Sequence, residues 1–321
     1  MQKVRVFLNQ QASQSAERDW QALIRQCLFR SELEFVTPQS PAQFDSEIDR
    51  ATRDNIDIII SVGGDGTIHA LIQKLAGKQT AFLPLPAGTA NDLSRSLGLQ
   101  GLRVHDALIN VRRGKPKPID LIDINGRLMA TNGGVGIVAD CATQINELRQ
   151  NVPGFRKFMS VAKGEIYSLV LGSKLLQGAQ RHEILIESDE FSGQISTPML
   201  LINNQPSIAA RFKVAPNTKH DDGTFNVTVF MHKRTTDFIA SVYRIRQGVP
   251  PENDPLIRSF ETKAIRFKCL DGKKIDFIGD GELLSVSDVF NVSLRPKALL
   301  AFAETVEQIP HFDYSKAGAV G

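Results

Sequence analysis

The sequence predicts an α/β domain followed by a β-rich domain, and three observations support this fold class. Up to about residue 113, short apolar strand patterns alternate with segments of helical spacing. At the centre of that region, Gly63-Gly64-Asp65-Gly66-Thr67 joins an apolar β-branched run to a helical pattern. Beyond the Pro/Lys-rich segment 114–118, strand patterns dominate.

The N-terminal half alternates strands and helices in order. Its expected strands cover 4–8, 33–36, 56–62 and 80–85, and its expected helices cover 16–29, 42–53, 67–75 and the segment from Asn91 or Asp92 to Ser96. This alternation predicts parallel strands joined by right-handed crossovers. Ligands of such sheets bind at the carboxyl ends of the strands, where the turns after Leu8, Val36 and Val62 would lie.

The turn from Gly63 to Thr67 has the chemistry of a phosphate site. Its three glycines permit positive φ and a close approach of backbone N–H groups, and the following helix directs its positive dipole end into the same space. A tight turn without a ligand is the alternative. Because Asp65 would repel a bare phosphate, we expect it to hold a cation, accept a proton or hydrogen-bond a hydroxyl.

A second turn of this kind, Pro86-Ala87-Gly88-Thr89-Ala90-Asn91-Asp92, follows the next strand. Pro86 and Gly88 favour the turn, and Asn91 or Asp92 can cap the helix that follows. Plain capping is the alternative to ligand binding. Two phosphate-capable turns at the same end of one sheet nevertheless indicate a ligand-binding edge.

The C-terminal half reads as an antiparallel sandwich or barrel. A hairpin is expected at 119–124 and 128–131 around Asn125-Gly126, and further strands at 183–187, 199–202, 225–230, 264–268, 274–277 and 289–294. The segment 155–177 is expected to form a core helix, with contact to a bilayer surface as the alternative. We therefore expect domains at 1–117 and 118–304, followed by a partly disordered segment, 305–321.

The whole chain has the composition of an ordinary globular protein. At 321 residues it exceeds the size at which single cores tend to divide, and 42% of its residues are hydrophobic. A net charge of +3 without a clustered basic stripe argues against nucleic acid and allows an anionic membrane surface. Three scattered cysteines and the lack of a secretory or membrane-spanning run predict a cytoplasmic protein, with peripheral contact at the inner membrane face open. An exposed edge strand would allow a homodimer.

Two acidic turns lie in the C-terminal half. Lys219-His220-Asp221-Asp222-Gly223-Thr224 offers the hard oxygen ligands that Mg²⁺ or Ca²⁺ needs, and a plain Asp-Gly turn is the alternative. Asp280-Gly281-Glu282 places two carboxylates around a glycine, where one could orient or deprotonate a hydroxyl beside a donor phosphate. Zinc spacings, a G-x-S-x-G sequence and a Walker A lysine are all absent from the sequence.

Taken together, four motifs resemble the diacylglycerol kinase catalytic-domain family of lipid kinases, which includes soluble bacterial diacylglycerol kinases, YegS-like lipid kinases and sphingosine kinases. They are GGDGT at 63–67, PAGTAND at 86–92, APNTKHDDG at 215–223 and GDGE at 279–282. The resemblance implies a Rossmann-like nucleotide domain, similar to those of NAD kinase and phosphofructokinase, and a C-terminal antiparallel β-sandwich. It also implies transfer of the γ-phosphate of ATP to a lipid hydroxyl, such as that of diacylglycerol, at a membrane surface.

The resemblance also assigns residues. ATP contacts would fall on Asn9, Ser13, Thr37, Gly63, Gly64, Asp65, Gly66, Thr67, Gly88, Thr89, Asn91 and Asp92. A Mg²⁺ site would use Asp222 with the backbone carbonyls of Lys219 and Thr224. The base would be Glu282, Asp280 or Asp65; Glu282 is favoured, with the other two in the cation and hydrogen-bond network.

The chain departs from the family pattern in three places. The first loop, from Asn9 to Ser13, lacks the usual proline and glycine, Ala70 replaces a usual glutamate, and Ala209-Ala210-Arg211 replaces a glycine triplet. These departures keep two alternatives open. One is an inactive nucleotide- or lipid-binding regulator, and the other is an NAD-kinase-like phosphotransferase with a soluble acceptor.

Overall fold

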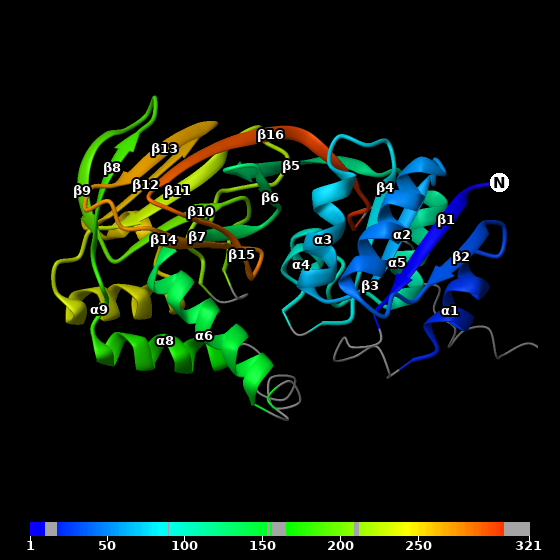
Figure 1. Ribbon diagram of the computed structural model, residues 1–321, viewed down its shortest axis with the longest axis horizontal. Helices are drawn as coiled ribbons and strands as arrows, with labels where there is room; N and C mark the ends of the chain where they lie inside the picture. The colour runs from blue at the N-terminus through cyan, green and yellow to red at the C-terminus, as the bar shows by residue number, and fades with distance from the viewer. Residues whose placement is uncertain (10–17, 89, 153–154, 156–164, 209–211, 305–321) are drawn as a thin grey trace, which may run out of the picture.

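A computed structural model describes residues 1–9, 18–88, 90–152, 155, 165–208 and 212–304 (Figure 1). It shows an α/β half at the N-terminus and two packed sheets in the C-terminal half. The predictions for Ser13, Thr89, the segment 209–211 and the tail 305–321 lie outside the described residues.

The N-terminal half contains a parallel sheet with the strand order β2-β1-β3-β4, as the alternating pattern predicts. The strands are β1 (Lys3–Leu8), β2 (Glu32–Val36), β3 (Ile58–Gly63) and β4 (Ala81–Pro86). The helices are α1 (Trp20–Cys27), α2 (Pro41–Arg53), α3 (Asp65–Leu75), α4 (Asp92–Ser96) and α5 (Val104–Arg113). Helix α5 is not among the predicted elements, although its buried Val104, Leu108 and Val111 follow helical spacing.

The central strand of this sheet is β3, and every one of its residues is buried. It pairs with β1 on one side and with β4 on the other. A parallel strand that is covered on both faces needs apolar residues at consecutive positions, which explains the unbroken run of isoleucines from Ile58 to Ile60. The end of this strand is therefore a rigid support for the glycine turn that follows it.

The C-terminal half is a β-sandwich, which confirms the first of the two predicted architectures. One layer is an antiparallel sheet in the order β12-β11-β10-β7-β14-β15. Its strands are β7 (Asn132–Gly136), β10 (Met199–Asn203), β11 (Phe225–Phe230), β12 (Ile257–Thr262), β14 (Ile275–Gly279) and β15 (Glu282–Ser287). The opposing layer consists of β5 (Lys117–Ile124), β6 (Arg127–Met129), β8 (His182–Glu187), β9 (Ser192–Thr197), β13 (Ala264–Cys269) and β16 (Val289–Ala301). Phe225, Phe267, Phe277 and Phe290 fill the core between the layers.

Three helices lie along one side of the sandwich (Figure 1). They are α6 (Ile137–Asn151), α8 (Glu165–Gln177) and α9 (Thr235–Arg246), and a short helix, η2 (Pro251–Asn253), follows α9. Ile166, Val170 and Leu175 of α8 are buried in a core cluster, so the described part of the segment 155–177 is a core helix. Its contact with a bilayer stays a prediction. None of the helices in the described part of the chain has the length and apolar character needed to cross a membrane.

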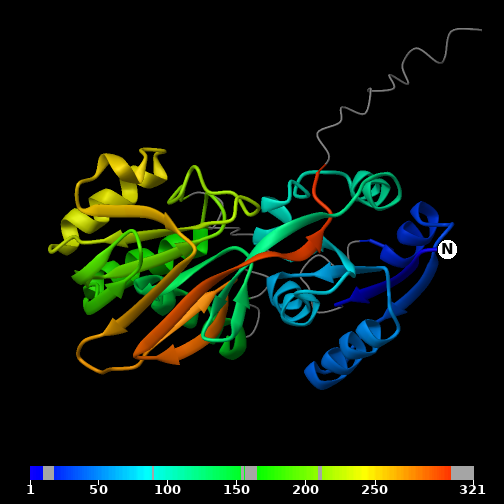
Figure 2. The same cartoon turned by 90° about the horizontal axis from the view of Figure 1, so that it is seen from above.

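The two halves share one sheet through β16. This strand pairs with β13 inside the sandwich, and its last residue, Ala301, pairs with Phe82 of β4. Strand β5 accompanies β16 along most of its length, and both run between the two halves (Figure 2). A continuous strand thus connects the α/β half to the sandwich.

Candidate active site

The two predicted glycine turns touch each other at the carboxyl ends of β3 and β4. Gly63 pairs with Pro86, and the N–H of Ala87 donates to the carbonyl of Gly63 at 3.1 Å. A Cβ at Gly88 would lie 2.5 Å from the Cα of Gly64. The glycine at position 88 is therefore required by this close approach rather than by an unusual φ.

Asp65, the first residue of α3, holds the second turn. Its carboxylate accepts the N–H of Asn91 at 3.0 Å and the N–H of Asp92 at 2.9 Å. These are among the N–H groups that a helix leaves without partners at its N-terminus, here the N-terminus of α4. Asp65 thus caps a neighbouring helix and joins the two motifs.

Of the two residues predicted as possible caps of α4, Asn91 takes the N-cap position. Asn91 lies at the N-cap position with φ +53° and makes no capping hydrogen bond. Its side chain binds Gly88 instead, with Nδ2 donating to the carbonyl at 2.8 Å and Oδ1 accepting the N–H at 2.9 Å. Because Asp65 supplies the cap, Asn91 is free to close the Gly88 turn.

The site gathers partly buried acidic groups. Burial raises the pKa of Asp65, and the nearby Asp280 raises it further, against the opposing effect of the N–H donors. Burial and Asp65 raise the pKa of Asp92 to about 6, although Asp92 accepts a hydrogen bond from Arg95 at 2.6 Å. A positive charge bound among these carboxylates would lower their pKa values and favour their ionised form.

The Asp280-Gly281-Glu282 motif forms the hairpin between β14 and β15. Asp280 and Gly281 have φ values of +53° and +81°, the positive values that a type I′ turn needs at both central positions. The carboxylate of Asp280 accepts the N–H of Thr131 at 2.8 Å, the hydroxyl of Thr131 at 2.6 Å and the N–H of Ala130 at 2.9 Å. Asp280 therefore ties the hairpin to the start of β7, and its side chain is only 7% exposed.

Glu282 differs from the other two candidate bases. Its Oε1 lies 2.9 Å from the position that a Cβ on Gly66 would take, directly over the first turn of α3. Among the described residues, no hydrogen bond engages its carboxylate. Burial raises its pKa, with contributions from Asp65 and Asp280 that His69 and Arg149 oppose.

The other predicted nucleotide contacts are only partly brought together. Asn9 follows β1, and its Nδ2 donates to the hydroxyl of Thr67 at 2.8 Å. Thr67 in turn packs against Gly63, where a Cβ would lie 2.7 Å from its Oγ1. Thr37 follows β2, which β1 separates from β3, so the structure does not bring it against the glycine turns.

The predicted metal turn is ordered by its own carboxylate. Oδ1 of Asp222 accepts the N–H and the hydroxyl of Thr224, both at 3.1 Å, and Oδ2 accepts the N–H of Lys219 at 3.2 Å. The three residues thus lie together. In the described part of the chain, no group of three or more His, Cys, Asp or Glu side chains is arranged to hold a metal ion.

Several supporting residues are absent from the sequence predictions. Buried Asp120 accepts the N–H of Gly223 at 2.9 Å and donates its own N–H to the carbonyl of His220 at 2.7 Å. Asn146 donates to the carbonyl of Gly281 at 3.1 Å. These partners are distant in sequence and belong to no motif, and the acidic type of Asp120 within an apolar strand was the one signal available.

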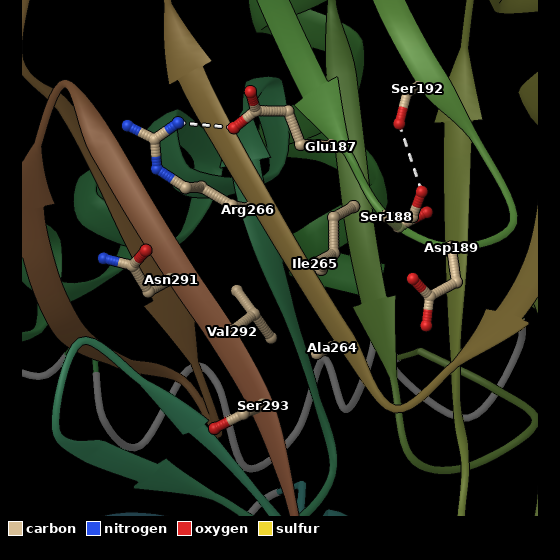
Figure 3. A pocket seen from close by; sticks show the side chains of 10 residues that line it. All are labelled: Glu187, Ser188, Asp189, Ser192, Ala264, Ile265, Arg266, Asn291, Val292 and Ser293. Atoms are coloured by element: carbon tan, nitrogen blue, oxygen red, sulfur yellow. Dashed lines mark hydrogen bonds and ion pairs between the residues drawn. The ribbon is translucent and has the colours of Figure 1, made fainter.

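A groove of about 510 Å³ lies away from this site (Figure 3). Strands β8, β9, β13 and β16 and the turn between β8 and β9 line it, and the ion pair between Glu187 and Arg266 is part of this lining. None of the predicted site residues contributes to this groove. Its position therefore gives no support to a role in the chemistry at the glycine turns.

Comparison with known proteins agrees with both halves of this architecture. The family "Diacylglycerol kinase catalytic domain" matches residues 3–124, and the family "YegS C-terminal NAD kinase beta sandwich-like domain" matches residues 158–303. The α/β half thus matches a kinase catalytic-domain family, and the sandwich matches an NAD-kinase-like sandwich family. Both matches, together with relatives named diacylglycerol kinase, support a lipid kinase role.

Individual relatives are moderately similar. A diacylglycerol kinase of Bacillus subtilis (strain 168) is 29% identical over 230 residues, which is 70% of this chain and 71% of the relative. A "Probable lipid kinase YegS-like" of Klebsiella pneumoniae (strain 342) is 26% identical over 260 residues, covering 78% and 80% of the two chains. A crystal structure of a diacylglycerol kinase from Bacillus anthracis (strain Sterne) superimposes with a TM-score of 0.68 at 17% identity, covering 94% and 97%. The last similarity shows that the fold is shared.

Proposed function

We propose that this protein transfers the γ-phosphate of ATP to a hydroxyl group of a lipid such as diacylglycerol. The observation that carries the proposal is the position of Glu282. Its carboxylate stands over the first turn of α3, and in the described part of the chain it alone among the three candidate bases accepts no hydrogen bond. It is therefore available to accept a proton.

The residues present suit a nucleotide triphosphate. The N–H of Gly66, near the start of α3, has no intrahelical acceptor, and the helix dipole favours an anion at this end. The close approach of Gly88 to Gly64 keeps side chains out of the space between the turns. We assign the phosphate contacts to the two glycine turns, with Asn9 and Thr67 beside them; the assignments of Ser13, Thr37 and Thr89 stay predictions.

The acidic residues suit a divalent cation such as Mg²⁺ that arrives with the phosphates. The carboxylate oxygens of Asp65 and Asp280 already accept hydrogen bonds from N–H and hydroxyl donors. A cation bound here would therefore need phosphate oxygens among its ligands. Such a cation would neutralise charge on the phosphates during transfer. A separate Mg²⁺ site at Asp222, with the carbonyls of Lys219 and Thr224, is part of the proposal.

The chemistry assigned to the chain itself is simple. Glu282 accepts the proton of the lipid hydroxyl while the hydroxyl oxygen bonds to the γ-phosphorus, and the bond from that phosphorus to the bridging oxygen breaks, so ADP leaves. Asp280 fixes the hairpin that carries Glu282, and Asp65 holds the two glycine turns together. The raised pKa of Glu282 makes it a better proton acceptor than an ordinary glutamate.

We further propose that the acceptor is reached at a membrane surface through peripheral contact, and that the chain divides functionally near residue 117. A homodimer formed through an edge strand belongs to the same set of proposals.

The test is incubation with radiolabelled ATP, Mg²⁺ and a total lipid extract, followed by organic extraction. We expect label in the organic phase with the wild-type protein and with the control Glu261→Gln, an exposed residue of β12. Glu282→Gln should lower transfer by roughly 10²- to 10⁴-fold while ATP binding persists. Label on NAD instead of lipid, or full transfer by Glu282→Gln, would contradict the proposal.

A further inference from the structure

One face of α3 contacts both the glycine turns and the Asp280 hairpin. Asp65, His69 and Gln73 are spaced by four residues and so lie in a row along the helix. Asp65 contacts the N-terminus of α4, His69 contacts Asp280, and Gln73 contacts Leu128 of β6. A single helix thus touches the glycine turn of one half and the Asp280 hairpin of the other.

Gln73 binds the backbone of Leu128 with both ends of its amide. Its Nε2 donates to the carbonyl of Leu128 at 2.7 Å, and its Oε1 accepts the N–H of Leu128 at 3.0 Å. Strand β6 pairs only with β5 among the described strands, so its outer edge is available for this contact. Two opposed hydrogen bonds to one residue fix both the position and the orientation of β6 against α3.

These two hydrogen bonds orient Gln73, and its orientation determines which ring nitrogen of His69 carries the proton. The amide nitrogen of Gln73 is a donor, and it lies 3.4 Å from Nε2 of His69, which must then be the acceptor. The ring proton of neutral His69 therefore resides on Nδ1, which faces Oδ2 of Asp280 at 3.4 Å. The backbone of Leu128 thus orients Gln73, Gln73 orients His69, and His69 presents a donor to Asp280.

A second path runs through the chain itself. Ala130 and Thr131 follow β6 directly, and their N–H groups bind the carboxylate of Asp280. Glu282 lies two residues after Asp280 and returns to the start of α3, above Gly66. Both paths begin at Gln73 and end at the hairpin that carries Glu282.

We propose that Gln73 is a positioning residue that aligns Glu282 with the nucleotide end of α3. This inference rests on the proposed function, because it assigns Gln73 a part in aligning the proton acceptor with the phosphate. Gln73 lies near the C-terminal end of α3, and the glycine turn lies at the N-terminal end. A change at Gln73 should therefore alter the alignment of the Glu282 carboxylate and leave the nucleotide contacts in place. An error of about 1 Å in such an alignment costs roughly 10²-fold in rate.

The test compares Gln73→Met, which keeps the shape of the side chain and removes both hydrogen bonds, with Lys74→Met. Lys74 is the next residue on α3, and its Nζ binds Asp49 of α2 at 3.0 Å, away from β6. We expect Gln73→Met to lower kcat for lipid phosphorylation by roughly 10- to 100-fold with little change in KM for ATP. Lys74→Met should match the wild-type protein in both constants.

Amide hydrogen exchange provides a readout that does not depend on turnover. In Gln73→Met without any substrate, the N–H of Leu128 and those of the Asp280 hairpin should exchange roughly 3- to 10-fold faster than in Lys74→Met. Unchanged exchange in the hairpin, or faster exchange with unchanged kcat, would overturn the proposal. If the wild-type protein transfers no phosphate, the proposed function fails, and exchange in the hairpin still decides whether Gln73 controls its position.

Discussion

The substitution Asp280→Asn separates the scaffolding role of Asp280 from the chemical role of Glu282. The carboxylate of Asp280 accepts three short hydrogen bonds from Thr131 and Ala130, and 7% of its side chain is exposed. Asparagine has the same shape and tolerates the φ of +53° at this position. The substitution therefore changes the acceptors and leaves the turn intact.

The expected magnitude follows from these contacts. The new amide group would face the N–H of Ala130, and an unsatisfied buried donor costs about 1–3 kcal/mol. The bonds from Thr131 would pass from a charged to a neutral acceptor, which costs about 1 kcal/mol more. We expect a loss of about 2–4 kcal/mol in the free energy of unfolding. At about 2 °C per kcal/mol for a chain of this size, Tm should fall by about 4–8 °C.

The assay is thermal unfolding followed by circular dichroism, with two comparison variants. Asp276→Asn changes a partly exposed aspartate of the neighbouring strand β14 and should leave Tm unchanged. Glu282→Gln should also keep or slightly raise Tm, because burial already raises the pKa of this glutamate and its charge is unfavourable in the folded state. An unchanged Tm for Asp280→Asn, or an equal fall for Glu282→Gln, would refute the division of roles.

Two further predictions concern the glycine turns. The pKa of Asp92 is raised from 3.8 to about 6 in the folded state, so protonated Asp92 stabilises the folded protein by up to about 3 kcal/mol below pH 4, and this stabilisation is lost as the pH rises towards 6. Asp92→Asn should flatten the dependence of Tm on pH in this range. An unaltered dependence would contradict the assignment. Gly88→Ala places a Cβ 2.5 Å from the Cα of Gly64 and should weaken ATP binding in calorimetry by roughly tenfold or more, with a stability loss of about 1–3 kcal/mol. Gly172→Ala in α8, where a Cβ meets no neighbour within 4 Å, is the matched control and should bind ATP normally.

Local pattern was enough to predict the elements that carry the motifs. The isoleucine run of β3, the glycines after it and the helical spacing of α3 all lie within 20 residues, and they form the predicted strand, turn and helix. Gly88 was likewise predicted as a turn residue. What the pattern could not show was its contact with Gly64.

The strands and hydrogen-bond partners that the sequence does not predict have identifiable physical reasons for being missed. Strand β7 has the sequence Asn-Gly-Gly-Val-Gly, which carries almost no strand propensity and pairs because its glycines let neighbouring backbones approach. The sequence predicts β16 only to Leu294, because Pro296 interrupts the strand pattern, and in the structure the pairing with β5 is irregular between Arg295 and Leu299. The partners of Asp65 and Asp280 are separated from them by 26 to 211 positions, so no local rule could assign these carboxylates to hydrogen bonds.

The shared strand β16 has a consequence for folding and for protein engineering. A chain cut after residue 117 would contain all of β1 to β4, yet it would lack the segment around Ala301 that closes the sheet beside Phe82. The α/β half would then expose the edge of β4, which β16 covers in the intact chain. The sheet of the first half can therefore be completed only after β16 has been synthesised, and any exchange of halves between relatives would have to carry β16 along with the N-terminal residues.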